Sequence, residues 1–341
     1  MQLGGSCQPG ARPFCLQAGV PQGRLIVARL VPICVQSGVV AFALLVAGQA
    51  HAQTEAPAQI TTEVGLGYES QTSALLRLSP QGELINIDGL QRLGGSHARI
   101  GIQGHTHWQF DDGLGLSLTA DASHKRAPGA SDFDLSLISV QPEVHLAMPS
   151  GSAGWGLTLQ HMDVAGRPFR EVTGSQVNWT RVDAEGGMWS VVADLTANRH
   201  IEFSDLDALG SSLSVQRHWV KPLRGLDSID LSLYLSRERN TQGFDELSYR
   251  NVMLSASTEW RLLDLTWSVG ASLQRILFDN TAFTDAVARV DHSAGFEFSM
   301  EHELTPRSAL RVEYSNVRST SSIPMYDNAY QQIAVKVRTT W

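Results

Sequence analysis

The chain has 341 residues, of which 43% are hydrophobic and 18% are charged, and its formal net charge at pH 7 is −8. This acidic balance argues against a nucleic-acid partner, which would need a basic face. All three cysteines, Cys7, Cys15 and Cys34, lie near the N-terminus, so we expect no disulfide framework, thiolate metal site or cysteine nucleophile beyond residue 52.

The first 52 residues have the pattern of a signal peptide. They contain three arginines and no Asp or Glu, and an uncharged stretch from Leu30 to Ala50 precedes the small residues of Ala50-His51-Ala52. We expect cleavage between Ala52 and Gln53. The alternative is a membrane anchor, but the densest apolar part, 38–47, is about half of the roughly 20 residues that a spanning helix needs.

The rest of the chain alternates apolar residues with polar or small ones, as in Ile229-Asp230-Leu231-Ser232-Leu233-Tyr234-Leu235-Ser236. Side chains alternate sides on a strand, so each such segment has one apolar and one polar face. We count about 14 segments by this alternation: 61–69, 97–110, 113–126, 134–148, 154–165, 170–183, 187–201, 208–220, 227–240, 248–260, 263–277, 289–304, 308–319 and 329–341.

Alternation alone does not separate a soluble β-sandwich from a membrane barrel. Three further features favour the barrel. The segments span about 10 to 14 residues, whereas soluble strands average about 5 or 6. Their polar faces are rich in Gly, Ser and Thr, and tryptophans recur near segment ends, where an interfacial girdle would lie. The sequence therefore predicts an all-β fold, a transmembrane antiparallel up-and-down barrel of about 14 strands, with residues 53–60 as a short periplasmic lead and 61–341 as the barrel.

The connections alternate between tight turns, such as 183–187, and longer stretches, such as 278–288 and 320–328. This alternation is typical of outer-membrane barrels, and an even strand count places both termini in the periplasm. The stretch 70–96 is open to two interpretations, a hairpin within a loop or two more barrel strands. Pro142, which cannot donate to a ladder, predicts a bulge or a strand end.

The polar faces predict which side chains point into the lumen. The lumen-lining prediction comprises Arg99, His105, His107, Asp121, Asp194, Asp230, Glu297, Glu301, Arg311, Glu313, Lys336 and Arg338. Both charges occur, which suits either a polar channel or an internal charge network. His105 and His107 share a face and could help to hold a metal, but no third ligand is placed by the sequence, so we expect no metal and no cofactor.

Catalysis has weak support in the sequence. In the adjacent pairs Ser123-His124 and His292-Ser293, neighbours on a strand point to opposite faces and cannot serve each other. The acidic residues of the predicted rim are more simply solvated loop charges: Asp132, Asp134, Asp205, Asp207, Asp245 and Glu246. We therefore expect that the protein is not an enzyme.

Two features carry a family resemblance. The final segment ends in Trp341, which resembles the terminal aromatic that closes outer-membrane barrels and is read by the barrel-assembly machinery. Residues 311–327, ending in Ser321-Ser322-Ile323-Pro324-Met325-Tyr326-Asp327, together with Arg289-Val290-Asp291, are similar to the C-terminal barrel of surface lipoprotein assembly modifiers. Members of that family commonly carry a helical-repeat domain before the barrel, and no 34-residue helical repeat is present here.

The resemblance implies a barrel in the outer membrane of a Gram-negative bacterium that takes part in the export or surface assembly of lipoproteins. Its partners would be outer-membrane lipid, the barrel-assembly machinery and a surface lipoprotein. The alternative is a narrow porin-like channel for small polar solutes, and an outer-membrane hydrolase is the least favoured function.

Overall fold

The computed structural model describes residues 58–72, 76–78, 84–86, 93–110, 113–128, 131–280, 288–323 and 326–341. The predicted signal peptide, residues 1–52, and most of the predicted lead lie outside these ranges. The described part of the chain contains no helix that is long and apolar enough to cross a membrane.

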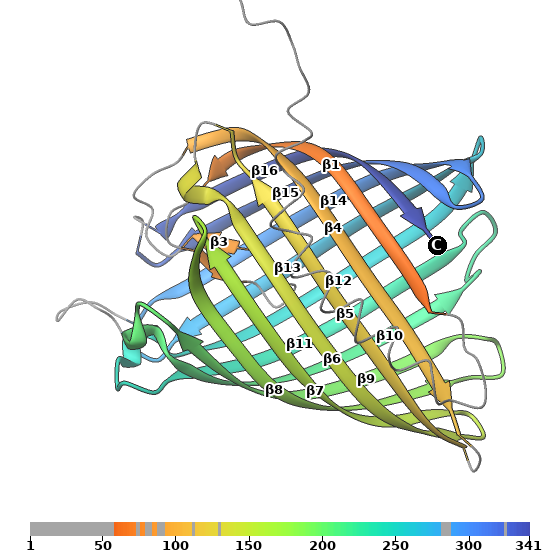
Figure 1. Cartoon of the computed structure of the whole chain (residues 1–341), viewed down its shortest axis with the longest axis horizontal. Helices are drawn as coiled ribbons and strands as arrows, with labels where there is room; N and C mark the ends of the chain where they lie inside the picture. The colour runs from red at the N-terminus through yellow and green to blue at the C-terminus, as the bar shows by residue number, and fades with distance from the viewer. Residues whose placement is uncertain are drawn as a thin grey trace, which may run out of the picture.

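Fourteen antiparallel strands form one closed barrel (Figure 1). In chain order they are β1 (Gln59–Thr72), β4 (Leu93–Gln109), β5 (Leu114–Arg126), β6 (Leu135–Met148), β7 (Gly151–Val164), β8 (Arg167–Val182), β9 (Met188–His200), β10 (Ala208–Val220), β11 (Ser228–Asn240), β12 (Tyr249–Leu262), β13 (Leu265–Phe278), β14 (Val290–Thr305), β15 (Ser308–Ser321) and β16 (Asn328–Thr340). Each strand pairs with its chain neighbours, so the predicted fold class and strand number are confirmed.

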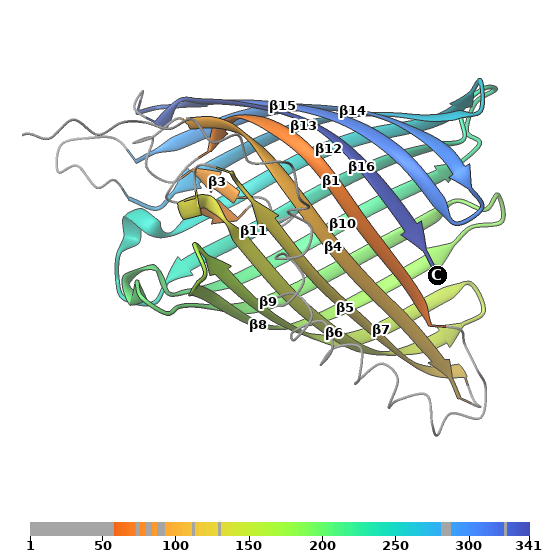
Figure 2. The same cartoon turned by 45° about the horizontal axis from the view of Figure 1, so that its top comes forward.

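The first strand closes the barrel because it pairs on both edges. Thr61 lies opposite Thr340 of β16 on one side and opposite Gln103 of β4 on the other. Beyond the end of β16, the backbone N–H of Trp341 donates to the carbonyl oxygen of Ile60 at 2.8 Å. Figures 1 and 2 show β1 beginning and β16 ending at the same end of the barrel. Closure leaves no unpaired edge, which is the condition for a β-protein to span lipid.

The region 70–96 adds no strand to the wall. β2 (Leu76–Leu78) and β3 (Leu84–Asn86) form a separate two-stranded sheet within the β1–β4 connection. The stretch is therefore a hairpin within a loop, the first of the two interpretations.

The two ends of the barrel differ in their connections. At the end that holds β1's start, short turns join the strands, and the longest lies between Val220 and Ser228. The other end carries the β1–β4 and β13–β14 loops and three short 3-10 turns, η4 (Ser131–Phe133), η5 (Ser204–Leu206) and η6 (Asp245–Leu247). We call these the short-turn end and the long-loop end.

One face of the wall is apolar and the other is polar. Paired residues share a face, so the register carries the alternation around the whole barrel. Apolar side chains such as Leu66, Leu195 and Leu273, with 69%, 67% and 63% of their surface exposed, lie on the outer face. Pro142 neither ends β6 nor shifts its register; the ladder to β7 simply lacks the pairs of residues 141 and 142.

All eight tryptophans lie on the outer face at the short-turn end: Trp108, Trp155, Trp179, Trp189, Trp219, Trp260, Trp267 and Trp341. Amphipathic indole rings favour a membrane–water interface, so this ring of tryptophans marks one interfacial level. Among them, the guanidinium of Arg217 lies 5.2 Å from the ring centroids of both Trp189 and Trp219 and donates to Asp183 in the β8–β9 turn.

Candidate functional site

The polar inner face of the barrel is the candidate site. The register places the twelve residues of the lumen-lining prediction on this one face: Arg99, His105, His107, Asp121, Asp194, Asp230, Glu297, Glu301, Arg311, Glu313, Lys336 and Arg338. Long side chains meet there across intervening strands, as when Lys125 of β5 reaches Glu69 of β1 over β4. That these residues line a path for a solute stays a prediction.

Ion pairs join the inner side chains of β14, β15, β16 and β1, a region that we call the paired wall. The Nζ of Lys336 lies 2.7 Å from Glu313 Oε2 and 3.3 Å from Glu63 Oε1. Arg311 Nε lies 2.9 Å from Glu313 Oε1, although its angle does not give a hydrogen bond. Lys336 and Arg311 thus compensate part of the negative charge on this wall.

The paired wall continues across β1 and β4 to β5. Lys125 Nζ donates to both carboxylate oxygens of Glu69 at 2.6 Å, and His97 Nδ1 lies 3.7 Å from Glu69 Oε1. Two inward glycines of β1 make room for these groups. A Cβ on Gly67 would lie 2.6 Å from the His97 ring, and one on Gly65 would lie 2.8 Å from Lys336 Cγ.

Strands across the barrel carry acidic side chains of a different kind. We call Asp194 of β9, Asp230 of β11 and Glu259 of β12 the carboxylate wall. Asp194 accepts a hydrogen bond from Ser212 Oγ at 2.7 Å, and Asp230 Oδ1 lies 2.8 Å from His218 Nδ1. Within the described residues, none of the three has a Lys or Arg nitrogen within 4.0 Å.

Acidic residues outnumber Lys and Arg on the inner face of the described strands. The thirteen carboxylates are Glu63, Glu69, Asp121, Glu143, Asp194, Asp230, Glu238, Glu259, Asp291, Glu297, Glu301, Glu303 and Glu313. The eight basic residues are Arg99, Lys125, Arg167, Arg170, Arg261, Arg311, Lys336 and Arg338. The inner face is therefore net negative.

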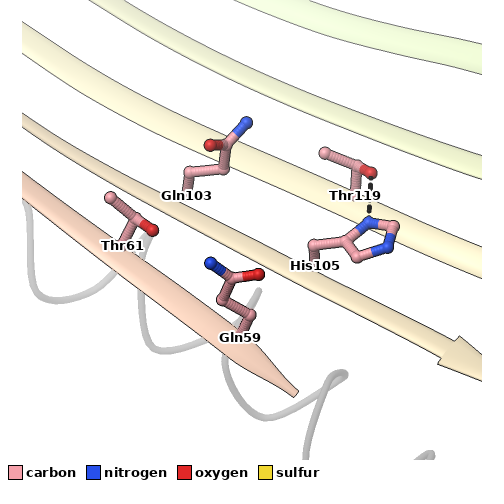
Figure 3. Close-up of a pocket in the computed structure, with 5 residues that line it drawn as sticks. All are labelled: Gln59, Thr61, Gln103, His105 and Thr119. Atoms are coloured by element: carbon pink, nitrogen blue, oxygen red, sulfur yellow. Dashed lines mark hydrogen bonds between the residues drawn. The ribbon is translucent and has the colours of Figure 1, made fainter. Parts of the chain in front are cut away.

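His105 lines a pocket of about 230 Å³ on the inner face near the short-turn end, with Gln59, Thr61, Gln103 and Thr119 (Figure 3). Its Nδ1 lies 3.0 Å from Thr119 Oγ1. His107 instead stacks on His145, with ring centroids 4.5 Å apart. The two histidines thus have separate partners, and no group of three or more His, Cys, Asp or Glu with metal-binding geometry occurs in the described part of the chain.

Two of the rim carboxylates order the loops at the long-loop end. Asp134 Oδ1 accepts from the backbone N–H of Ala127 at 2.8 Å, and Asp207 Oδ1 accepts from that of His200 at 2.6 Å. Each bond ties the two ends of a loop together, which gives these residues a structural explanation.

The residues that carry the family resemblance lie around the β15–β16 connection. Asp327 Oδ1 accepts from the Ser321 backbone N–H at 2.7 Å, and the Arg289 guanidinium lies 3.5 Å from the centroid of the Tyr326 ring. Arg289 also donates to Asp291 at 2.6 and 2.9 Å. The motif thus forms an ordered part of the rim; Pro324 and Met325 lie outside the described residues.

Glu63, Glu69 and Lys125, which take part in the paired wall and its continuation, are absent from the lumen-lining prediction. Glu63 and Glu69 alternate with the outward Val64, Leu66 and Tyr68, which was a usable signal, whereas Lys125 lies between His124 and Arg126 and has no such signal. The contacts themselves depend on the register of β1 against β4 and β16, which alternation does not give.

No protein-family model matches the chain, and no curated protein matches it in sequence. Solved structures with a similar arrangement include OmpT of Vibrio cholerae without loop L8 (8% identity, 84% of this chain and 99% of that one, TM-score 0.43). Others are OccAB3 of Acinetobacter baumannii (6%, 84% and 100%, 0.44) and an anion-selective porin from Comamonas acidovorans (9%, 84% and 99%, 0.44). The first is described as an outer membrane protein. The fold assignment of this chain rests on its own strand pairing, which defines a closed barrel of the outer-membrane type.

Proposed function

We propose that the protein is a narrow outer-membrane channel for small polar solutes and that it favours cations. The observation that carries this proposal is the polar inner face, which has thirteen carboxylates and eight Lys and Arg side chains. Fixed charge of one sign raises the local concentration of the opposite ion in a confined aqueous space.

The outer face supports the membrane location. It exposes large apolar side chains around the barrel, and such a surface would promote aggregation of the protein in water. The tryptophan ring lies at one end of the barrel, and β1 begins and β16 ends at that same end, among the short turns. Since short turns face the periplasm in this class of barrel, we place both termini there.

The strand number sets the scale of the lumen. Barrels of about 8 strands are filled by side chains, whereas barrels of 16 to 18 strands leave wide aqueous channels. Fourteen strands lie between these limits. A path for ions and small polar molecules fits this size, and the proposed function needs no catalytic step.

Planar bilayer recording tests the proposal. Refolded protein in a KCl gradient should give stable stepwise conductance with a reversal potential of the sign set by cation flow. Heat-dependent mobility in SDS gels establishes separately that the barrel is folded. A folded protein without conductance steps would contradict the channel, and an anion-selective current would contradict its charge preference.

The export or surface assembly of lipoproteins, implied by the family resemblance, is the second proposal. The ordered rim around Tyr326 and Asp327 supports it, because an ordered rim offers a defined surface to a partner. Deleting the gene should then remove a lipoprotein from the cell surface, and re-expression of an Asp327→Ala variant should restore it poorly. Unchanged surface display after deletion would refute this proposal without affecting the channel.

A further inference from the structure

A group of basic side chains lies on the outer face at the long-loop end, opposite the end that holds the tryptophans. We call it the outer basic belt. It comprises one or two residues on each of five adjacent strands, β11 to β15 (Figure 1): Arg237, Arg239, Arg250, Arg275, His292 and Arg318. The register places these residues on the outer face with Leu235, Val252 and Leu273. The residues between them, such as Glu238 and Asn251, point inward.

The belt has little acidic compensation. Arg237 and Arg250 lie directly opposite each other on β11 and β12, an arrangement that like charges disfavour. Asp279 is 3.6 Å from each, so one carboxylate serves two guanidiniums. No Asp or Glu occupies an outer-face position of β11 to β15, and Arg239, Arg275 and Arg318 take part in no ion pair among the described residues.

The belt directly borders the apolar band. On β11 the outer residues run Ile229, Leu231, Leu233 and Leu235 and then change to Arg237 and Arg239. The apolar stem of an arginine can lie along lipid tails while its guanidinium remains at headgroup level. The side chains of Arg237 and Arg250 are 55% and 62% exposed, so their guanidiniums are accessible.

We propose that the outer basic belt binds the phosphate groups of a lipid in the leaflet around the long-loop end. The continuity of belt and apolar band favours a lipid, because Arg237 and Arg250 follow Leu233 and Leu235 on the outer face, as headgroups follow acyl chains in a leaflet. Guanidiniums bind phosphate oxygens through paired hydrogen bonds. Several arginines around one carboxylate suit a headgroup with two phosphates better than one with a single charge.

The inference rests on the barrel lying in a membrane and is independent of conductance. Detergent-purified protein is titrated with lipid A, a lipid with two phosphates, and the bound fraction is measured by native mass spectrometry. The test variant replaces Arg237, Arg250 and Arg275 with Gln. The matched control replaces Arg181, Arg224 and Arg307, at the short-turn end, with Gln and so loses the same charge.

An arginine at an anionic lipid surface contributes about 1 kcal/mol, or about fivefold in affinity. The test variant should therefore bind lipid A at least tenfold more weakly, whereas the control should bind within about twofold of the unmodified protein. Phosphatidylglycerol, with one phosphate, should bind more weakly than lipid A to the unmodified protein, and dephosphorylated lipid A more weakly still.

Three results would overturn the inference: undiminished lipid A binding by the folded test variant, equal loss in the control, or displacement of lipid A by inorganic phosphate at the same concentration. The last would show a site for free phosphate. If the triple variant does not fold, the single Arg275→Gln variant should still bind about fivefold more weakly. A test variant that conducts normally but fails to bind lipid A would support lipid binding by the outer basic belt. If the unmodified protein does not conduct at all, that result contradicts only the channel proposal.

Discussion

Lys336 on the closing strand lies 2.7 Å from a carboxylate oxygen of Glu313 on the neighbouring strand, and its other contact is with Glu63 on the first strand. The Lys336 side chain thereby connects the two strands that flank β16, namely β15 and β1, on the inner face of the barrel. The Lys336 side chain is 14% exposed, so most of it is shielded from solvent. This position couples the closure of the barrel to the charge of its lining.

The Lys336→Gln variant should be less stable and more cation-selective. It leaves Glu63 and Glu313 without the shared ammonium, so two carboxylates lose compensation while Glu313 retains Arg311. For partly exposed ion pairs the loss is about 1 kcal/mol in the free energy of unfolding. Urea unfolding in lipid vesicles and the reversal potential in a KCl gradient measure the two effects. Lys221→Gln, in a turn at the short-turn end, is the control, and an unchanged reversal potential for Lys336→Gln would contradict the prediction.

The Asp194→Asn/Asp230→Asn variant should be less cation-selective and nearly as stable. An amide oxygen can still accept from Ser212 or Gln216, so the hydrogen bonds of the carboxylate wall can persist while its charge is lost. The reversal potential should move toward zero. Glu185→Gln, in an exposed turn outside the lumen, removes a carboxylate without this effect. Equal shifts for both variants would mean that the charge of the whole protein, and not the carboxylate wall, sets the selectivity.

The sequence predicts this fold well because alternation acts on each strand separately. The strand that ends before Trp341 shows its apolar set, Ile333, Val335 and Val337, without reference to any other strand. Strand number, faces and the tryptophan ring follow from such local patterns. The paired wall does not, because the contact of Lys125 with Glu69 requires the register of three strands. The bulge or strand end predicted at Pro142 was wrong for the same reason, since only the pairing with β7 decides whether the missing backbone donor interrupts the strand.

The Leu263→Asn variant should be more stable. Leu263 and Asp264 form the two-residue β12–β13 turn with φ of 54° and 59°, the left-handed region of a type I′ hairpin. A branched residue is disfavoured there by roughly 1–2 kcal/mol, whereas Asn tolerates it. Leu263 is 83% exposed, so little packing is lost. Urea midpoints in vesicles should rise. Arg307→Asn, in a turn without positive φ, should show no gain, and an equal rise there would assign the effect to polarity instead of backbone conformation.

Changes at Trp341 should separate closure from recognition. Its backbone exchanges hydrogen bonds with Ile60 at 2.8 and 3.4 Å, and its ring lies on the outer face with 64% exposure. Trp341→Ala keeps the backbone hydrogen bonds, so refolding in detergent should be nearly normal. Assembly in cells should fall, because the assembly machinery is expected to recognise the aromatic ring. Deletion of Trp341 also removes the bonds, each worth about 1 kcal/mol, and should impair refolding. Trp341→Phe should assemble normally. Normal assembly of Trp341→Ala in cells would refute recognition of the aromatic ring.

The Asp183→Asn variant should lose part of the acid sensitivity of the barrel. A hydrogen bond from Arg217 holds the pKa of Asp183 below its usual value, and the backbone N–H of Gly187 lowers it further. A carboxyl whose pKa is lower in the folded state stabilises the fold above its unfolded pKa and loses this contribution as the pH falls through the folded value. The unmodified protein should therefore lose stability below about pH 4, the usual range for aspartate. Asp183→Asn should be less stable at neutral pH, and its stability should change less as the pH falls through that range.

Asp264→Asn, in another short turn, is the control. Tryptophan fluorescence reports the transition because Trp189 and Trp219 flank Arg217. Parallel pH profiles for the unmodified protein and Asp183→Asn would show that the Arg217–Asp183 contact does not contribute to the acid response.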